Sequence, residues 1–170
     1  MGKVLLLTGD PGIGKTTLIR HVVESLGQPV GGFYTQEIRQ GKQRKGFEIV
    51  TLDGQRGLLA HVDIHGQRRI SRYGVNTTAL EEVAIPTILK AVNDHAIVII
   101  DELGPMEFCS KIFCQTVLKI LQGDSSVLGS IVKRHTPFSD RIKSLPEVML
   151  VEVTRHNRDH LVKQIRKQLL

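Results

Sequence analysis

One glycine-rich stretch near the start of the chain restricts the possible folds more than any other feature. A strand-like apolar run ends at Thr8, and a helical pattern of apolar residues begins after Lys15. The connecting stretch and its continuation read Gly9-Asp10-Pro11-Gly12-Ile13-Gly14-Lys15-Thr16-Thr17. Glycine tolerates left-handed backbone angles, so consecutive N–H groups can point into one concavity at the positive end of the following helix. This is the Walker A pattern in its strand–loop–helix context, and it predicts a site for the phosphates of a nucleoside triphosphate.

Two side chains of this stretch have roles that derive from their chemistry. Lys15 can reach the β- and γ-phosphates of the nucleotide, and the Thr16 hydroxyl can hold a Mg²⁺ ion. We therefore expect residues 9–17 to bind the nucleotide, Lys15 to take part in catalysis and Mg²⁺ to be the cofactor.

A second apolar run, residues 96–100, ends in a pair of acids. Because it has no polar alternation, it predicts a central strand that is buried on both faces. Asp101 and Glu102 match the Walker B role: Asp101 would bind the Mg²⁺ directly or through water, and Glu102 would orient or deprotonate the attacking water. Glu107 either lines the same site or is a solvent-facing acid near a helix start, and the sequence leaves both interpretations open.

The remaining segments predict a single α/β domain over residues 1–170. Strands are expected at 30–39, 46–52, 57–62, 68–73, 127–132 and 148–153, and helices at 16–26, 77–92, 110–122 and after 159. Pro86 should bend or break the second helix. The fold class is a three-layer arrangement, with a mainly parallel central sheet, helices on both faces and a β-hairpin insertion after the first helix.

Basic residues follow the strand predicted at 127–132. In a parallel sheet, Lys133, Arg134 and His135 would reach the edge that holds the phosphate loop, where one cation could stabilise charge on the γ-phosphate. Arg141 is a further candidate on a short helix after Pro137. For each of these cations a surface role is the favoured interpretation.

The loop before the last helix often lies beside the nucleotide base in such folds. Arg155, Asn157 and Arg158 are therefore candidates for contact with the base or a phosphate, and Asn157 and Arg158 are included in the predicted nucleotide site. A helix N-cap is the alternative role for Asn157.

The formal net charge of +6 and the pI of about 9.5 raise the question of a nucleic-acid partner. Aromatic residues make up only 4% of the chain, which leaves little material for stacking bases. Nucleic acid is therefore an open but not favoured partner, and the basic turn at 39–45 is interpreted as a solvated hairpin tip.

Other features of the sequence indicate a cytoplasmic, monomeric protein. Charged residues interrupt every apolar run, so no membrane span is expected, and the N-terminus leads directly into a core strand without room for a signal peptide. Cys109 and Cys114 lie five residues apart in a helical pattern, on different faces, and are expected to be reduced.

With these residues in view, the sequence resembles the THEP-type nucleoside-triphosphatase family of small P-loop NTPases. The resemblance spans nearly the whole chain and rests on blocks at 9–17, 32–35, 37–39, 46–47, 101–107 and 157–159. It implies a RecA-like, additional-strand P-loop fold and slow, Mg²⁺-dependent hydrolysis of ATP, GTP, CTP and UTP to diphosphate and phosphate. The family's phosphate loop corresponds to residues 9–17, and its acidic pair to Asp101 and Glu102.

Two other functions are compatible with these motifs. A nucleotide or nucleic-acid kinase would share the phosphate loop and add a second substrate pocket with a basic lid. An RNA-binding or switch module would use the nucleoside triphosphate only as a ligand, without intrinsic catalysis.

Overall fold

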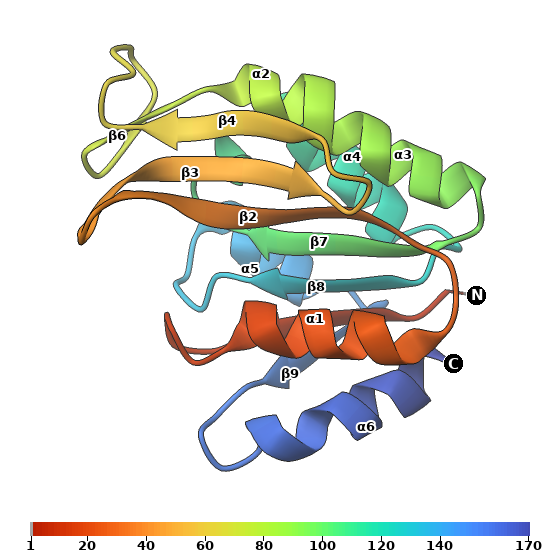
Figure 1. The fold of residues 1–170 in the computed structure, drawn as a ribbon. Coiled ribbons are helices and arrows are strands. Elements are labelled where there is room, and N and C mark those ends of the chain that lie inside the picture. The colour runs from red at the N-terminus through yellow and green to blue at the C-terminus, as the bar shows by residue number, and fades with distance from the viewer. Residues whose placement is uncertain (1) are drawn as a thin grey trace.

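Nine strands form one sheet in the computed structural model, which describes residues 2–170 (Figure 1). In chain order the strands are β1 (Val4–Thr8), β2 (Val30–Gln40), β3 (Gln43–Thr51), β4 (Arg56–His61), β5 (Arg69–Ile70), β6 (Tyr73–Val75), β7 (Ile97–Leu103), β8 (Val127–Ile131) and β9 (Val148–Glu152). Their order across the sheet is β5-β6-β4-β3-β2-β7-β8-β1-β9. The predicted α/β fold with a P-loop arrangement is confirmed.

The half of the sheet from β2 to β9 is parallel, and its inner strands β7, β8 and β1 are buried, whereas the edge strand β9 is partly exposed. The pairs β2–β7, β7–β8, β8–β1 and β1–β9 all run in the same direction. Every residue of β1 is buried, and so are Val98, Ile99 and Ile100 in β7. Strands covered on both faces need such unbroken apolar runs. Their carboxyl ends meet at one edge of the sheet, at the left in Figure 1.

The other half, β3 to β6, is antiparallel, and we call it the extension. Strands β3, β4, β6 and β5 add in turn to the edge of β2. The insertion is therefore larger than the predicted hairpin. The single strand predicted at 68–73 is wrong, because Ser71 adopts a φ of 54° and turns the chain between β5 and β6.

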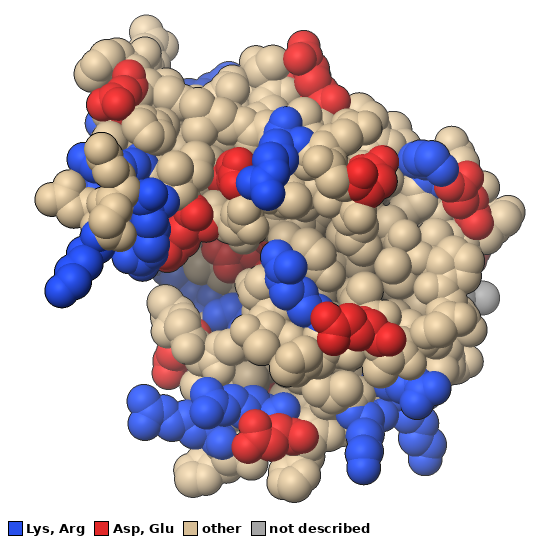
Figure 2. All heavy atoms as spheres, in the orientation of Figure 1, with Lys and Arg blue, Asp and Glu red and all other residues tan. Residues whose placement is uncertain are grey.

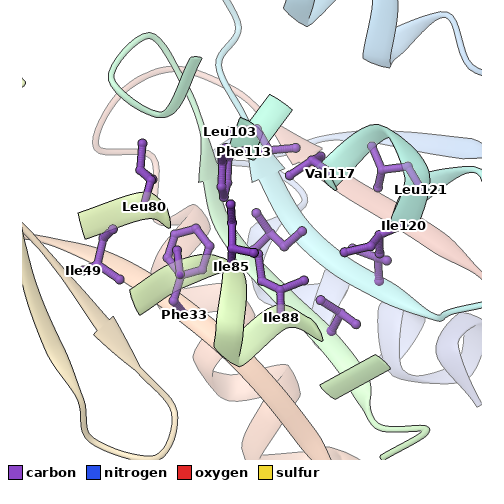
Figure 3. Close-up of a cluster of buried hydrophobic side chains, with 14 of the residues drawn as sticks. Phe33, Ile49, Leu80, Ile85, Ile88, Leu103, Phe113, Val117, Ile120 and Leu121 are labelled. Atoms are coloured by element: carbon purple, nitrogen blue, oxygen red, sulfur yellow. The ribbon is translucent and has the colours of Figure 1, made fainter. Parts of the chain in front are cut away.

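Helices cover both faces of the sheet. They are α1 (Lys15–Leu26), α2 (Thr77–Ala79), η1 (Leu80–Ala84), α3 (Ile85–Asn93), η2 (Glu107–Cys109), α4 (Lys111–Leu121), α5 (Pro137–Lys143) and α6 (Arg158–Leu169). Helices α1 and α6 pack on one face, and the buried side chains of α2, η1, α3, α4 and α5 join a single core on the other. Figure 3 shows this second core, where Phe33 meets Phe113 edge to face at 6.0 Å. No helix within residues 2–170 has the length and apolar character needed to cross a membrane.

The helix predicted at 77–92 is not broken at Pro86, and its irregularity is instead a π-helical turn directly before the proline. Asn76 caps α2 by accepting a hydrogen bond from the Thr78 N–H. The chain then widens into the π-helical turn η1, in which the Ile85 N–H donates to the Leu80 carbonyl. Pro86 lies in the first turn of α3, where its missing N–H is tolerated.

The two cysteines do not share a helix, contrary to the sequence-based expectation. Cys109 lies in η2 and Cys114 in α4, and Ser110 between them has an extended backbone and caps α4. Both thiols are free, as expected. Burial raises the pKa of Cys114 to about 11, so its thiol is inert at neutral pH.

Candidate functional site

The phosphate loop, residues 9–14, connects β1 to α1 at the carboxyl edge of the sheet. Gly9, Gly12 and Gly14 have φ values of 151°, 77° and 109°. A Cβ at Gly9 would also lie 2.7 Å from the Val153 carbonyl oxygen, whereas Gly12 and Gly14 face open space. Gly9 is therefore required by packing as well as by backbone angle, and the other two by backbone angle alone.

Lys15 and Thr16 are the first residues of α1, where the sequence placed them. The Lys15 ammonium donates to the carbonyl oxygens of Gly9 (2.9 Å) and Asp10 (3.2 Å), which keeps it over the phosphate loop. Thr16 lines the same cleft as Asp101 of β7, and its hydroxyl lowers the pKa of that carboxyl against the effect of burial. A lysine and a hydroxyl thus face the carboxyl edge from the same helical turn.

Asp101 is a buried carboxylate with one unused oxygen. It is 2% exposed, and the Ser130 hydroxyl of β8 donates to its Oδ1. Its Oδ2 is buried without a hydrogen-bond partner within the described residues. Burial raises the pKa of Asp101, against the opposing effects of Ser130, Thr16 and Lys15. A buried acceptor of this kind fits a hard cation, because carboxylate and hydroxyl oxygens are the donors that Mg²⁺ prefers.

Glu102 and Glu107 are two further acids close to Asp101. Burial, and then the charge of Asp101, raises the pKa of Glu102. Glu107 is 3% exposed and accepts a hydrogen bond from the Thr35 hydroxyl at 3.2 Å. Burial, and then the charge of Glu102, raises the pKa of Glu107 to about 8. The open question about Glu107 is answered: it lines the site and is not a solvent-facing acid.

Gly104 explains why these acids can lie so close together. A Cβ at this position would lie 2.9 Å from Glu102 Oε1 and 3.3 Å from Glu107 Oε2. A side chain there would displace both carboxylates. Gly104 is therefore part of the site, because its lack of a side chain leaves room for the two carboxylates.

A cleft of about 490 Å³ joins these groups. Its lining consists of Pro11, Gly12, Gly14, Lys15, Thr16, Thr17, Thr35, Glu37, Phe47, Ile70, Asp101, Glu102, Pro105, Met106 and Glu107. In Figure 2 it is the recess at the left of the molecule, with acidic atoms in its depth and basic side chains on its lips. The sequence analysis missed the wall formed by Thr35, Glu37, Phe47 and Ile70. The pairing of Tyr34 with Asp101 across β2 and β7 is what brings this wall to the site.

A larger hollow of about 650 Å³ lies beside β2 between residues of α1 and α3, lined in part by Arg20, Tyr34 and Lys90. The Arg20 guanidinium covers the Tyr34 ring at 4.3 Å. The smaller cleft is the better candidate site, because it joins the phosphate loop to the buried acids.

The loop before α6 lies next to the phosphate loop. Asn157 accepts a hydrogen bond from the Thr154 N–H and donates to the Glu152 carbonyl, both at 2.8 Å, so its amide shapes its own loop. It begins α6 without a capping hydrogen bond from its side chain. Arg158 donates to the Ile13 carbonyl at 3.3 Å and so reaches the phosphate loop.

Of the cations considered for phosphate contact, Lys133 is held against the phosphate loop. Its ammonium lies 3.0 Å from Asp10 Oδ1 and 3.5 Å from Glu152 Oε1. Arg134, Arg141 and Arg155 are exposed. Which of these cations contacts a nucleotide stays a prediction.

Comparisons with known proteins find relatives over nearly the whole chain. The family described as NTPase matches residues 4–166. The chain is 40% identical to nucleoside-triphosphatase THEP1 of Thermotoga maritima over 95% of this chain and 92% of that protein. It is 39% identical to the cancer-related nucleoside-triphosphatase of Homo sapiens, over 97% and 95%.

Two solved structures have the same fold. The crystal structure of THEP1 from Aquifex aeolicus superposes with a TM-score of 0.89 at 35% identity and covers 98% of each chain. The solution structure of the human cancer-related nucleoside triphosphatase gives a TM-score of 0.81 at 38% identity, covering 98% of this chain and 96% of that one.

Proposed function

The chain belongs to the NTPase family, and from that premise and the geometry of its cleft we propose that it hydrolyses nucleoside 5′-triphosphates to diphosphate and phosphate. The proposal includes ATP, GTP, CTP and UTP as substrates, a requirement for Mg²⁺ and slow turnover. One observation carries it. The phosphate loop, Lys15 and the acidic pair Asp101–Glu102 all line one cleft.

The phosphate loop and Lys15 would bind and stabilise the phosphates. The backbone N–H groups of the loop and of the first turn of α1 supply fixed dipoles, and the Lys15 ammonium adds a full charge. The transferred phosphoryl group gains charge on its outer oxygens in the transition state. Groups already fixed in place stabilise that charge without reorganisation.

Thr16 and Asp101 would hold the Mg²⁺. The unpaired, buried Oδ2 of Asp101 supports this assignment, and Ser130 fixes the orientation of the carboxylate through its other oxygen. Bound there, Mg²⁺ would neutralise charge on the β- and γ-phosphate oxygens. Within residues 2–170 no group of three or more His, Cys, Asp or Glu could hold a metal unaided. Water and phosphate oxygens would therefore complete the coordination.

Glu102 would accept the proton of the attacking water, or orient that water for in-line attack. It borders the same cleft as Lys15, and its raised pKa makes it a better base than an exposed glutamate. Gly104 leaves the space that the carboxylate occupies.

Two contacts support broad base specificity and slow turnover. The Asn157 amide is already bonded within its own loop, so it offers little for reading a base edge. Lys133 is paired with Asp10 and Glu152, so it would have to leave both acids to stabilise a γ-phosphate. An added cation of this kind is worth several orders of magnitude in related enzymes.

The test is phosphate release from ATP, GTP, CTP and UTP with Mg²⁺, for the wild type and Glu102→Gln. We expect release from all four in the wild type and a loss of about 100-fold or more in the variant, with nucleotide affinity retained. Glu147→Gln is the matched control, because Glu147 is exposed at the amino end of β9, away from the cleft. Full activity in Glu102→Gln would refute its role. Phosphate transferred to an acceptor and not to water would support a kinase.

A further inference from the structure

Seven basic side chains lie on the extension and on the adjoining end of the β2–β3 hairpin, beside the mouth of the cleft. We call this group the basic tip; it consists of Arg39, Lys42, Arg44, Lys45, Arg68, Arg69 and Arg72. They come from segments 39–45 and 61–73, which together contain one acid, Asp63. The antiparallel pairing of β3 with β4 brings the segments together, with Gly46 opposite His61. Figure 2 shows basic side chains concentrated at the upper left, next to the recess.

Two guanidinium groups of the basic tip converge on a single hydroxyl. Arg44 Nε donates to Tyr73 Oη at 2.9 Å, and Arg72 Nη2 donates to the same oxygen at 3.2 Å. The nearby Glu37 carboxylate pairs with Arg44 at 3.0 Å and with Arg39 at 2.7 Å. Two guanidiniums therefore share one carboxylate, and the third, that of Arg72, lies beside them on Tyr73. Like charges held this close repel one another, and a bound anion would relieve that repulsion.

The two lysines at the end of the hairpin are unpaired. Lys42 is exposed and Lys45 partly so, and neither ammonium has a hydrogen-bond or ion-pair partner anywhere in residues 2–170. One phosphate can neutralise only the nearest two or three of these cations. A chain of regularly spaced phosphates can reach all of them, which favours a polyanion over a small ion.

An aromatic side chain connects the basic tip to the cleft. Phe47 of β3 lines the cleft together with Ile70 of β5. Its ring packs edge to face on Tyr73 at 5.3 Å, and the Arg44 guanidinium lies 5.2 Å from its centre. A cleft of about 490 Å³ accepts one nucleotide but not a base-paired duplex. A nucleic acid could therefore bring a base to Phe47 as a single strand, and aromatic rings bind unpaired bases by stacking.

We propose that the basic tip binds a single strand of nucleic acid, with phosphates along its cations and the base nearest the cleft against Phe47. The interpretation of 39–45 as a solvated hairpin tip did not include Arg72 and Tyr73, which the fold brings there from another segment. The proposal does not depend on hydrolysis, because binding is measured without a nucleoside triphosphate.

The test uses a 5′-fluorescein-labelled oligouridylate RNA of about 12 nucleotides, whose binding is followed by fluorescence anisotropy. For the wild type, affinity should fall about tenfold or more between about 50 and 200 mM KCl. The charge reversal Lys42→Glu/Lys45→Glu should weaken binding about tenfold or more at the lower salt concentration. The matched control is Lys163→Glu/Lys167→Glu, which makes the same change in net charge at exposed positions of α6.

Three results would overturn the proposal. The first is an equal loss of affinity in the α6 control, which would indicate attraction to net charge alone. The second is equal or tighter binding of a duplex of the same sequence. The third is displacement of the oligouridylate by free UMP at micromolar concentration, which would indicate a mononucleotide site. Circular dichroism of both double variants verifies that each remains folded.

Discussion

The two walls of the cleft differ in almost every physical property. One wall is built by the parallel strands and the phosphate loop, and its acids Asp101 and Glu107 are buried. The other wall is formed by the last residues of β2 together with the extension, and its acid Glu37 in β2 has a side chain that is 38% exposed and lies among arginines. The same residue type therefore meets opposite surroundings within one cleft.

The pKa values of Glu107 and Glu37 show the effect of this difference. Burial raises the pKa of Glu107 to about 8. The hydrogen bond from Arg44 lowers the pKa of Glu37, helped by Arg39. Desolvation controls the chemistry of the buried wall, and ion pairing controls that of the exposed wall. Glu107 on the first wall can therefore hold a proton at neutral pH, whereas Glu37 on the second wall stays ionised.

Glycine substitutions should give the largest difference in stability between the parallel half and the hairpin. Gly32 of β2 has a φ of 127°, and a Cβ there would lie 2.0 Å from the Ile99 carbonyl oxygen of β7. Gly32→Ala should lower the free energy of unfolding by about 4 kcal/mol or more, because β2 and β7 must separate. Gly41 at the end of the hairpin has a φ of 62° and open space around it. Gly41→Ala should cost only about 1–2 kcal/mol.

Urea unfolding of both variants measures the difference. Equal costs at the two positions would mean that the parallel half adjusts as easily as the hairpin tip, and the contrast between the halves would fail.

Glu107→Gln tests whether the buried wall stores a proton. Above about pH 4.5 the unfolded carboxyl ionises, while the folded one keeps its proton up to about pH 8. The folded state then binds more protons, so the contribution of Glu107 to stability is complete below pH 4.5 and is lost as the pH rises towards 8. The variant should therefore gain stability over the wild type between pH 5 and pH 8, of the order of a few kcal/mol.

Urea unfolding at several pH values measures this slope, with Glu147→Gln as the control. Glu147 is exposed, so its variant should keep the slope of the wild type. A Glu107→Gln slope parallel to the wild type would show that Glu107 is ionised in the folded protein.

The parallel half was predictable because its signals are local. The glycine pattern at 9–14 and the apolar run before Asp101 lie within single stretches of sequence, and each identifies a strand together with the functional residues at its carboxyl end. Pro86 indicated an irregularity in its helix for the same reason, since its effect is local, although the helix widens before the proline and does not break.

The second wall was not predictable, because it is made by pairing between segments. Strands β5 and β6 contain two and three residues, too few to show a period. Phe47 reaches the cleft only through the register of β2 with β3, in which it lies opposite Glu37. The turn at Ser71 was not predictable either, because a serine does not indicate the positive φ that this residue adopts.

Glu37→Gln has the smallest expected effect and tests the exposed wall by two measurements. Because the folded pKa of Glu37 is lowered, its ion pairs stabilise the protein above about pH 4.5, and this stability is lost as the pH falls through the lowered value. The groups are exposed, so the variant should lose at most about 1 kcal/mol at neutral pH, and less at high salt. It also removes the acid that pairs with Arg39 and Arg44, so affinity for the oligouridylate should rise about two- to fivefold. A larger loss of stability, or weaker RNA binding, would mean that Glu37 organises the arginines and does not merely neutralise them.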